Sequence, residues 1–240
     1  MRIGNNLKLG VNIDHIATLR QARREMDPDP AAAALVCKRA GADMIVAHLR
    51  QDRRHIQDSD VFRLCRLKGE THLEIASVPS IISVVMRAKP DSVCLVPENP
   101  REVTTSGGLN LKKAPGLART IKRLKDADIE VSLFIDPDAA GVRAAKSLGV
   151  DAVELCTRPY AEAKGKKKVK AELERLELAG YLAYEMGMNL HAGHGLDYHN
   201  VQAVARIPHI TCLNIGFSII ARAVFAGLKG AVAEMKLLIS

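Results

Sequence analysis

Eight short runs of β-branched and aliphatic residues alternate along the chain with longer stretches of helical composition. The runs predicted to form strands are Leu9–Asp14, Met44–Leu49, His72–Ala76, Ser92–Val96, Glu130–Ile135, Ala152–Cys156, Met188–Ala192 and Thr211–Ile215. Stretches rich in Ala, Leu, Arg and Lys lie between and after them, among them Pro30–Ala40, Leu117–Ala127, Ala139–Leu148, Val169–Met186 and Ile219–Leu238. Strict alternation of this kind predicts a parallel sheet with right-handed crossovers.

Eight strand–helix pairs are the number that closes such a sheet into an α/β (β/α)8 TIM barrel. The chain has 240 residues, near the length of about 250 that is common for this fold. An open doubly wound sheet is the alternative, but it usually carries a glycine-rich turn after its first strand. Here that strand ends in Asn12-Ile13-Asp14-His15. No linker-like segment divides the chain, so we predict a single barrel domain over residues 1–240.

The formal net charge of +8 suits anionic partners, which include nucleic acids, membrane surfaces and phosphorylated metabolites. Aromatic residues make up 3% of the chain and Trp is absent, which argues against a base-stacking surface. Part of the excess charge lies in Lys164–Lys170. We interpret this run as a solvated surface loop, with a phosphate-attracting lid or a nucleic-acid patch as alternatives, and we expect no nucleic-acid partner.

Five scattered cysteines form no C-x-x-C pair, which is typical of proteins in a reducing cytoplasm. Residues Met1–Gly10 lack the apolar core of a secretory signal, and no uninterrupted apolar run reaches the length of a membrane span. We therefore expect a cytoplasmic protein that does not bind membranes.

Nearly every predicted strand carries a titratable or amide side chain near its exit. Catalytic groups of (β/α)8 barrels project from these ends, which share one face. Glu74 has apolar neighbours on both sides, so desolvation would raise the pKa of its carboxyl and suit it to act as a general base. Asp14 and Glu154 lie in similar apolar settings. For any one of the three, an internal ion pair at the barrel mouth is the alternative.

His48 and His194 lie at the exits of the second and seventh predicted strands. A lone histidine inside a barrel is commonly a hydrogen-bonded core residue. Two at separate strand exits, with carboxylates available, instead favour acid–base chemistry. The sequence has no H-E-x-x-H motif and no other closely spaced metal ligands, so we predict no metal site.

Two glycine-containing segments match the place where many barrels bind phosphate, after strands seven and eight. They are Ala192-Gly193-His194-Gly195 and Asn214-Ile215-Gly216-Phe217-Ser218, with Ser218 as the expected helix N-cap. A second anion site is indicated by Thr104–Gly108 together with Arg50 and His55. A flexible Ser/Gly loop is the alternative there.

Taken together, the segments closely resemble the pyridoxine 5'-phosphate synthase family of deoxyxylulose-dependent vitamin B6 biosynthesis. The resemblance is carried in collinear order by GVNIDHIATLRQAR from Gly10, AHLRQDRRHIQDSDV from Ala47, CLVPENPREVTTSGGLN from Cys94, VSLFIDPD from Val131, AGHGLDYHNV from Ala192 and LNIGFSIIARAVFAGLKGAVAEM from Leu213. It implies condensation of 1-deoxy-D-xylulose 5-phosphate with 3-amino-2-oxopropyl phosphate. It also implies a homo-oligomer, commonly an octamer, and no metal or organic cofactor.

The resemblance also implies roles for individual residues. His48 and Glu74 match proton acceptors, His194 a proton donor, and Glu154 an acid that stabilises the transition state. Contacts to the aminoketone phosphate are matched by Asn12, Arg23, Gly195 and Gly216, and contacts to deoxyxylulose phosphate by Asp14, His15, Arg50, His55 and Thr104.

This chain departs from the family pattern at three places. Phe217 stands where a phosphate-contacting His is usual, Arg158-Pro159 falls in a loop that usually contains glycine, and His191 replaces a common Asn. None of these changes removes a proposed acid or base. They leave open a second hypothesis, a catalytically silent barrel that binds a phosphometabolite.

Overall fold

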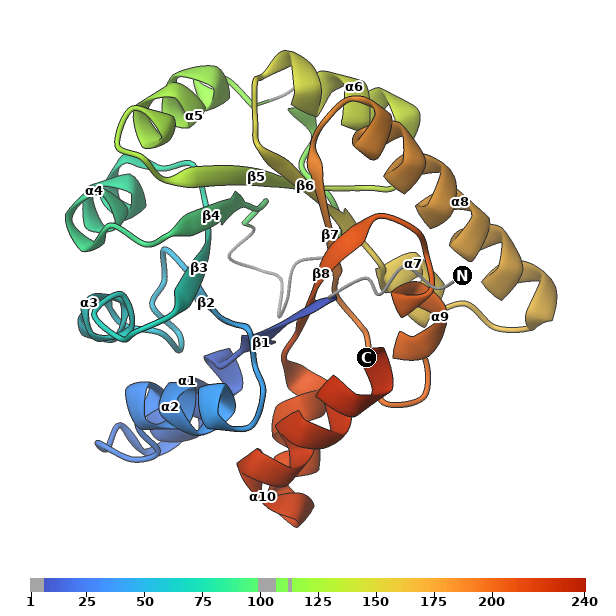
Figure 1. Cartoon of the computed structure of the whole chain (residues 1–240). Helices are drawn as coiled ribbons and strands as arrows, with labels where there is room; N and C mark the ends of the chain where they lie inside the picture. The colour runs from blue at the N-terminus through green and yellow to red at the C-terminus, as the bar shows by residue number, and fades with distance from the viewer. Residues whose placement is uncertain (1–6, 99–106, 112–113) are drawn as a thin grey trace.

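The computed structural model describes residues 7–98, 107–111 and 114–240. Eight parallel strands pair in sequence order, and β1 pairs with β8 through Leu9↔Leu213, so the sheet closes into a barrel (Figure 1). The strands are β1 (Lys8–Asn12), β2 (Met44–Leu49), β3 (Glu70–Ile75), β4 (Ser92–Leu95), β5 (Glu130–Ile135), β6 (Ala152–Cys156), β7 (Asn189–Gly193) and β8 (Ile210–Ile215). The predicted (β/α)8 fold is confirmed.

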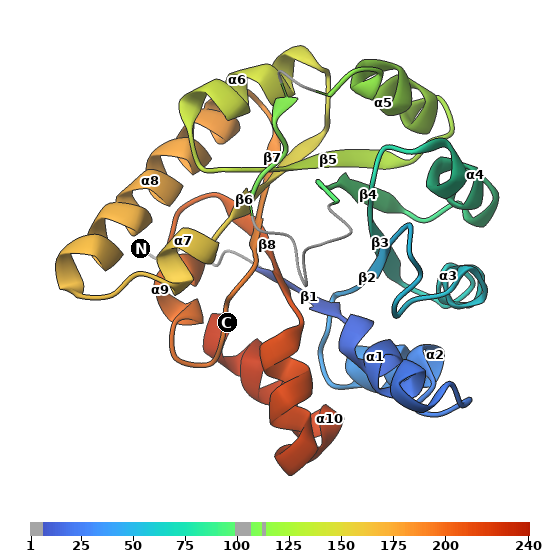
Figure 2. The same cartoon turned by 180° about the vertical axis from the view of Figure 1, so that it is seen from behind.

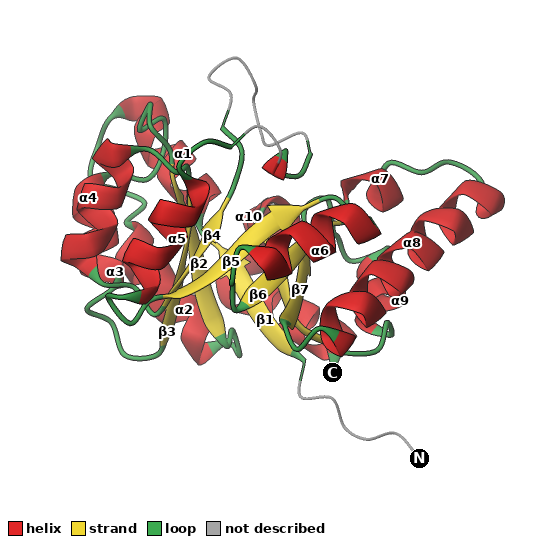
Figure 3. Cartoon of the chain, turned by 90° about the horizontal axis from the view of Figure 1, so that it is seen from above, coloured by secondary structure: helices red, strands yellow, loops and turns green. Residues whose placement is uncertain are grey.

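Helices surround the strands. Figure 2 shows the ring of helices from behind, and Figure 3 shows from above how the helices lie outside the strands. In the described part of the chain they are α1 (Asp14–Arg23), α2 (Pro30–Arg39), α3 (Asp58–Leu64), α4 (Pro79–Ala88), α5 (Leu117–Lys125), α6 (Ala139–Ser147), α7 (Arg158–Ala161), α8 (Lys166–Glu185), α9 (Val201–Ala205) and α10 (Phe217–Ile239). None of these helices is both long and apolar enough to cross a bilayer.

Local sequence explains several element boundaries. Asp29 precedes Pro30 at the start of α2, and its carboxylate accepts hydrogen bonds from the backbone N–H groups of Ala31 and Ala32. This satisfies donors that the first helical turn leaves free, while proline suits that turn because it needs no N–H there. In α10, Gly227 has φ 71° and ψ 151°, which breaks the helix into two segments.

Most predicted boundaries hold to within two residues, but two local predictions are wrong. Asp14 does not end the first strand; it begins α1, where a carboxylate is favoured by the helix dipole. The lysine run is not a loop throughout, because α8 begins at Lys166 and contains Lys166, Lys167, Lys168 and Lys170. These lysine side chains are exposed, so the solvated part of the interpretation agrees with the structure.

The barrel interior is unusually polar. Leu9 and Val11 belong to the apolar layer between strands and helices, so strand alternation turns Gly10 and Asn12 inward. Branched aliphatic side chains usually fill this space. Here it holds, from successive strands, Asn12, His72, Cys94, Ser132, Glu154, His191, Cys212 and Asn214. Polar side chains therefore extend from the barrel mouth into its middle.

Candidate active site

Four polar residues from three strand exits meet at the C-terminal mouth of the barrel. Asn12, at the end of β1, donates from Nδ2 to Glu74 Oε1 at 2.7 Å. Asp14 Oδ1 accepts a hydrogen bond of 2.7 Å from the backbone N–H of His48, which ties the start of α1 to β2. His48 Nδ1 lies 3.7 Å from Glu74 Oε2. The structure thus brings together residues that the sequence separates by up to 62 positions.

Glu74 has the properties expected of a general base. Desolvation raises the pKa of its carboxyl well above the usual range, and the nearby carboxyls of Glu154 and Asp14 raise it further. The amide of Asn12 opposes this shift by donating to the charged form. The side chain keeps 18% of its surface exposed, so it remains reachable from the mouth. A basic carboxylate at an accessible position can take protons from bound molecules near neutral pH.

His48 is buried against this cluster and is neutral near pH 7. Burial lowers the pKa of its imidazole to about 4, although the charge of Asp14 partly opposes the shift. Its Nε2 is buried and has no hydrogen-bond partner among the described residues. The ring of His55 lies 6.1 Å from that of His48. A neutral imidazole with a free nitrogen can accept or relay a proton from a bound ligand.

Glu154 lies deeper, in the middle of β6, with 3% of its surface exposed. Asn214 of β8 donates from Nδ2 to its Oε2 at 2.8 Å. Burial raises the pKa of the Glu154 carboxyl to about 7, while the hydrogen bonds from Asn214 and Cys94 hold it lower than burial alone would. The charge of Glu154 raises the pKa of Glu74 further, and the pKa of Glu154 itself is about 7, so the pair can both donate and accept a proton near neutrality.

His194 stands across the mouth, in the loop after β7. Its backbone has φ 84°, a left-handed conformation uncommon for a residue with a side chain. The Thr157 hydroxyl lies 2.6 Å from the His194 carbonyl oxygen and so supports the turn. Burial lowers the pKa of the His194 imidazole, and the charge of Arg158 lowers it further. The following Gly195 has φ 81°, which favours glycine at that position.

The predicted phosphate cradle lies at the start of α10. Gly216 precedes this helix without a capping side chain, so the first N–H groups remain available to an anion. A Cβ at Gly216 would lie 2.7 Å from Asn12 Cβ, so only glycine fits without displacement. Ser218 is not the N-cap as predicted: it lies within the helix, and its hydroxyl donates to the Leu196 carbonyl at 2.8 Å.

Phe217 is 69% exposed at the rim of this cradle. Its ring meets that of His15 edge to face, with centroids 5.2 Å apart. The two residues therefore form one side of the entrance, and the Phe217 ring offers an apolar surface in place of a hydrogen-bond donor.

Arg50 and His55 lie in the loop after β2, beside the mouth. Arg50 is only 2% exposed, and its Nε lies 3.4 Å from Asp52 Oδ1. Arg20 of α1 fixes the loop from below, with two hydrogen bonds of 2.7 Å to the carboxylate of Asp60 and one of 3.2 Å to the His55 carbonyl. The bidentate pair between Arg20 and Asp60 fixes the position of both side chains and, through the His55 carbonyl, of the loop backbone.

Two predicted site residues are not placed in this cluster. Arg23 lies on the surface at the end of α1, with 81% of its side chain exposed and its Nε 3.7 Å from Glu25. Thr104 lies outside the described residues.

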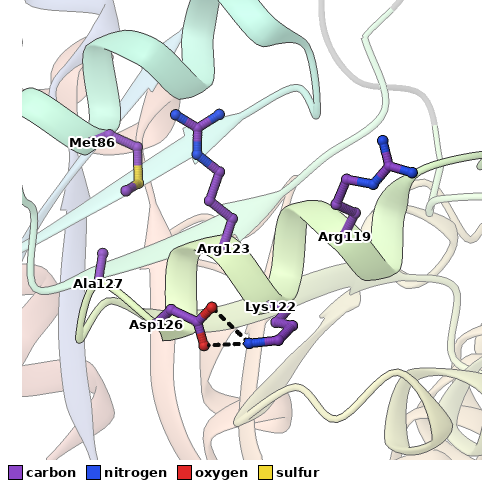
Figure 4. A pocket seen from close by; sticks show the side chains of 6 residues that line it. All are labelled: Met86, Arg119, Lys122, Arg123, Asp126 and Ala127. Carbon is purple, nitrogen blue, oxygen red and sulfur yellow. Dashed lines mark hydrogen bonds and ion pairs between the residues drawn. The ribbon is translucent and has the colours of Figure 1, made fainter.

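A surface hollow on the outside of the barrel is separate from the mouth (Figure 4). It is lined by Met86 of α4 and by Arg119, Lys122, Arg123, Asp126 and Ala127 of α5 and the turn that follows. Asp126 pairs with Lys122 at 2.7 Å. None of the proposed acids or bases lines this hollow, so it is not the candidate active site.

Comparison with known proteins agrees with this geometry. A family profile described as "Pyridoxal phosphate biosynthesis protein PdxJ" matches residues 9–240. The chain belongs to the PdxJ family. A relative from Elusimicrobium minutum described as "Pyridoxine 5'-phosphate synthase" is 51% identical over 233 residues, which cover 96% of each chain. A relative from Synechococcus sp. with the same description is 52% identical over 233 residues, covering 96% of this chain and 97% of the relative.

Solved structures share the fold at much lower identity. The phosphoribosyl anthranilate isomerase from Thermus thermophilus superposes with a TM-score of 0.61 and 16% identity over 96% of this chain and 98% of the other. KGPDC from Streptococcus mutans gives a TM-score of 0.63 and 14% identity over 97% of each chain. These likenesses support the (β/α)8 barrel alone.

In this PdxJ chain the unusual Arg158-Pro159 pair forms the first turn of α7, where proline is well tolerated. Arg158 Nε pairs with Glu162 Oε1 at 2.7 Å along the same short helix. The Arg158-Pro159 segment therefore forms a helical turn near His194, where the family pattern has a loop that contains glycine.

The sequence placed Asn214 at the end of the eighth predicted strand, in the phosphate-binding segment, but did not predict that it holds Glu154 directly. An amide within an otherwise apolar strand was the available signal. Its partner could not be inferred, because β6 and β8 are not adjacent and their side chains meet only across the barrel interior.

Proposed function

We propose that this chain is a pyridoxine 5'-phosphate synthase that condenses 1-deoxy-D-xylulose 5-phosphate with 3-amino-2-oxopropyl phosphate, giving pyridoxine 5'-phosphate, inorganic phosphate and water. The observation that carries the proposal is the grouping of Glu74 and His48 at the barrel mouth with Glu154 deeper in the same interior, both carboxyls having a pKa raised by burial. Imine formation, loss of phosphate, ring closure and dehydration all move protons. Each transfer gains about 10²–10⁴-fold from a positioned acid or base.

In this proposal Glu74 and His48 accept protons, His194 donates one, and Glu154 stabilises charge that develops during ring closure. The direct hydrogen bond from Asn12 keeps Glu74 oriented while burial keeps it basic. His48 offers a free Nε2, and His194 lies on another element, the loop after β7. Proton acceptors and a donor on different strands allow successive steps on one bound intermediate.

Two anion sites orient the substrates. Gly195 and Gly216, with Asn12, would bind the aminoketone phosphate through backbone N–H groups and an amide side chain. Asp14, His15, Arg50, His55 and Thr104 would bind the deoxyxylulose phosphate. Phe217 would contribute its backbone N–H to the cradle, because its ring cannot donate a hydrogen bond. Holding both substrates converts an encounter between two molecules into an oriented reaction.

The proposed enzyme needs neither metal nor organic cofactor, resides in the cytoplasm and assembles as a homo-oligomer, with an octamer suggested by the resemblance. Exposed apolar side chains support assembly: Leu19 on α1, Met26 in the loop that follows it, and Val224 and Phe225 on α10. Within its own chain Arg23 lies outside the site, so its proposed phosphate contact would have to be made across a subunit interface. The net charge of +8 suits the anionic substrates, and neither nucleic acid nor membrane is part of the proposal.

A catalytically silent barrel that binds a phosphometabolite is the second candidate. The observation that favours it is the apolar, exposed ring of Phe217 at the cradle. Such a protein would retain the anion sites without needing Glu74 to be basic.

Turnover by the purified chain decides between the two. Protein treated with a chelator is supplied with both substrates, and pyridoxine 5'-phosphate and inorganic phosphate are measured by chromatography and a phosphate assay. We expect equal amounts of the two products. The Elusimicrobium minutum relative, assayed alongside, serves as the positive control. If that relative gives product and this chain gives none while still binding the substrates, the silent-barrel hypothesis is correct.

A further inference from the structure

Below the mouth, the barrel interior brings three potential metal ligands together. His72 of β3, Cys94 of β4 and Glu154 of β6 each offer one donor atom, and these atoms all lie within 4.8 Å of one another. All three side chains are buried, with exposed fractions of 0%, 0% and 3%. They come from three rigid strands, so their relative placement is set by the barrel and not by a mobile loop.

The hydrogen bonding of His72 leaves one buried ring nitrogen without a partner. Its Nδ1 lies 2.6 Å from the Ser92 hydroxyl, whereas its buried Nε2 has no partner among the described residues. When Nδ1–H donates to Ser92, Nε2 carries the lone pair that a metal ion could take. Metal-binding histidines are commonly oriented in this way by a hydrogen bond at the other ring nitrogen. A buried nitrogen without a partner destabilises the fold, so a ligand bound at this nitrogen would offset that cost.

We propose that His72, Cys94 and Glu154 form a binding site for one thiophilic divalent transition-metal ion of the Zn²⁺ class. Sulfur, imidazole nitrogen and carboxylate oxygen are together the donors that zinc takes in proteins, whereas Mg²⁺ and Ca²⁺ prefer oxygen alone. A thiolate and a carboxylate also neutralise the two positive charges of the ion, which a buried site requires.

The geometry needs only small adjustments. Donors bonded at about 2.0–2.3 Å around a tetrahedral ion lie roughly 3.5 Å apart. The three donor atoms lie within 4.8 Å of one another, so they have to approach by up to about 1.3 Å. His191, whose Nδ1 is also buried without a partner, lies opposite Glu154 in the pairing of β6 with β7. Its ring is 6.1 Å from that of His72, so His191 or a water fills the fourth position.

Binding here has a consequence for the reaction. Glu154 belongs to the acid–base set of the proposed function, so a metal ion that takes one of its oxygens removes it from proton transfer. The ion is thus an inhibitor and not a cofactor. This consequence rests on the proposed function, whereas metal binding itself does not.

Cobalt(II) tests binding directly, because a thiolate bound to Co²⁺ gives an intense near-ultraviolet charge-transfer absorption. Chelator-treated protein is incubated overnight with Co²⁺, titrated to stoichiometry and then challenged with Zn²⁺. We expect one Co²⁺ per chain with this absorption and its loss when Zn²⁺ displaces the cobalt. Absence of the absorption from the unaltered protein overturns the proposal, and this result depends on no variant.

Variants locate the site. Cys94→Ser should abolish the charge-transfer absorption, and His72→Asn should weaken Co²⁺ binding by about tenfold or more. Cys37→Ala is the matched control, because Cys37 is an equally buried thiol on α2, outside the barrel interior. Circular dichroism establishes that each variant is folded. An absorption that persists in folded Cys94→Ser, or that disappears in Cys37→Ala, places the metal elsewhere and overturns the proposal. The titration needs no substrates, so its failure is distinct from failure of the synthase assay.

Discussion

The carboxylates and the histidines of the barrel interior differ in how far their polar atoms are satisfied. Each carboxylate of the site has a partner: Glu74 accepts from Asn12, Asp14 accepts from the His48 backbone, and Glu154 accepts from Asn214. His48 at the mouth, and His72 and His191 in the layer below, each keep one buried ring nitrogen without a partner in the described part of the chain.

The two kinds of group differ in the chemistry that they allow. Hydrogen bonds at the mouth hold the acids in place and moderate pKa values that burial alone would raise further. In the lower layer, burial lowers the pKa of His72 to about 3 and of His191 to about 4, which keeps both rings neutral with lone pairs available. The first arrangement suits proton transfer, and the second suits a ligand that accepts lone pairs.

Replacing the base of the mouth layer should have the largest effect. Glu74→Gln preserves shape but removes the basic oxygen, so kcat should fall by about 10²–10⁴-fold with folding intact. Steady-state kinetics and circular dichroism measure the two. Glu70→Gln is the control, because Glu70 lies on the same strand at the opposite end and pairs with Lys8 on the surface. Equal turnover by Glu74→Gln and the unaltered protein would remove Glu74 from its role.

The buried histidines of both layers should lower stability in acid. His48, His72 and His191 have folded pKa values of about 4, 3 and 4, below the 6.5 of a free imidazole. Unfolding in this window therefore takes up protons, so stability is present above pH 6.5 and is lost as the pH falls toward 4. The raised pKa of Glu154, about 7, acts in the opposite sense, since its contribution falls as the pH rises from 4.5 to 7. The raised pKa of Glu74 acts in the same sense as that of Glu154, so the contribution of the histidines is measured one residue at a time.

His72→Asn should accordingly reduce the loss of unfolding free energy between pH 6.5 and 4, by on the order of 1–3 kcal/mol. Urea unfolding at several pH values measures this change. His199→Asn, at an exposed position, should leave the pH dependence as it is. If His72→Asn and the unaltered protein lose stability in parallel, the ring of His72 is not held neutral by burial.

Breaking a partnership at the mouth should shift the pH dependence of turnover. Asn214→Ala removes a donor to the charged form of Glu154, so the pKa of that carboxyl should rise and the corresponding limb of the kcat profile should move to higher pH. We expect a loss of about tenfold in kcat at neutral pH. Asn189→Ala, at the other end of the barrel, serves as the control. A profile that keeps its position would show that Asn214 does not tune Glu154.

The smallest effect is expected at the rim. Phe217→His restores a side chain able to donate to phosphate, and should lower KM by a few-fold with kcat nearly unchanged, a gain on the order of 0.5–1.5 kcal/mol. Phe225→His is the control, because Phe225 is exposed on the same helix and away from its N-terminus. An unchanged KM in Phe217→His would mean that the backbone of the cradle is sufficient by itself.

Much of the fold follows from local sequence. Strand–helix alternation predicts the barrel, and Met44–Leu49, Glu130–Ile135 and Ala152–Cys156 begin and end at their predicted residues. The apolar run before Asp14 predicts a strand, yet the structure places this carboxylate at the start of α1. The residue type of Ser218 predicts an N-cap, but its hydroxyl has a tertiary partner in Leu196. Local preference is overridden where a distant group offers a better bond.

The sequence by itself determined the class of fold, the family, and the strand exits where His48, Glu74, Glu154 and His194 lie, because these depend on periodicity and on motifs that are contiguous in the chain. Which groups touch was decided only by closure of the barrel. Closure turns Asn214 onto Glu154 across the interior and leaves Arg23 on the surface. It also brings together His72, Cys94 and Glu154, which no ligand spacing in the sequence links. Side chains from non-adjacent strands come into contact only when the sheet closes into a barrel. The number of residues between them in the sequence does not predict how far apart they lie in space.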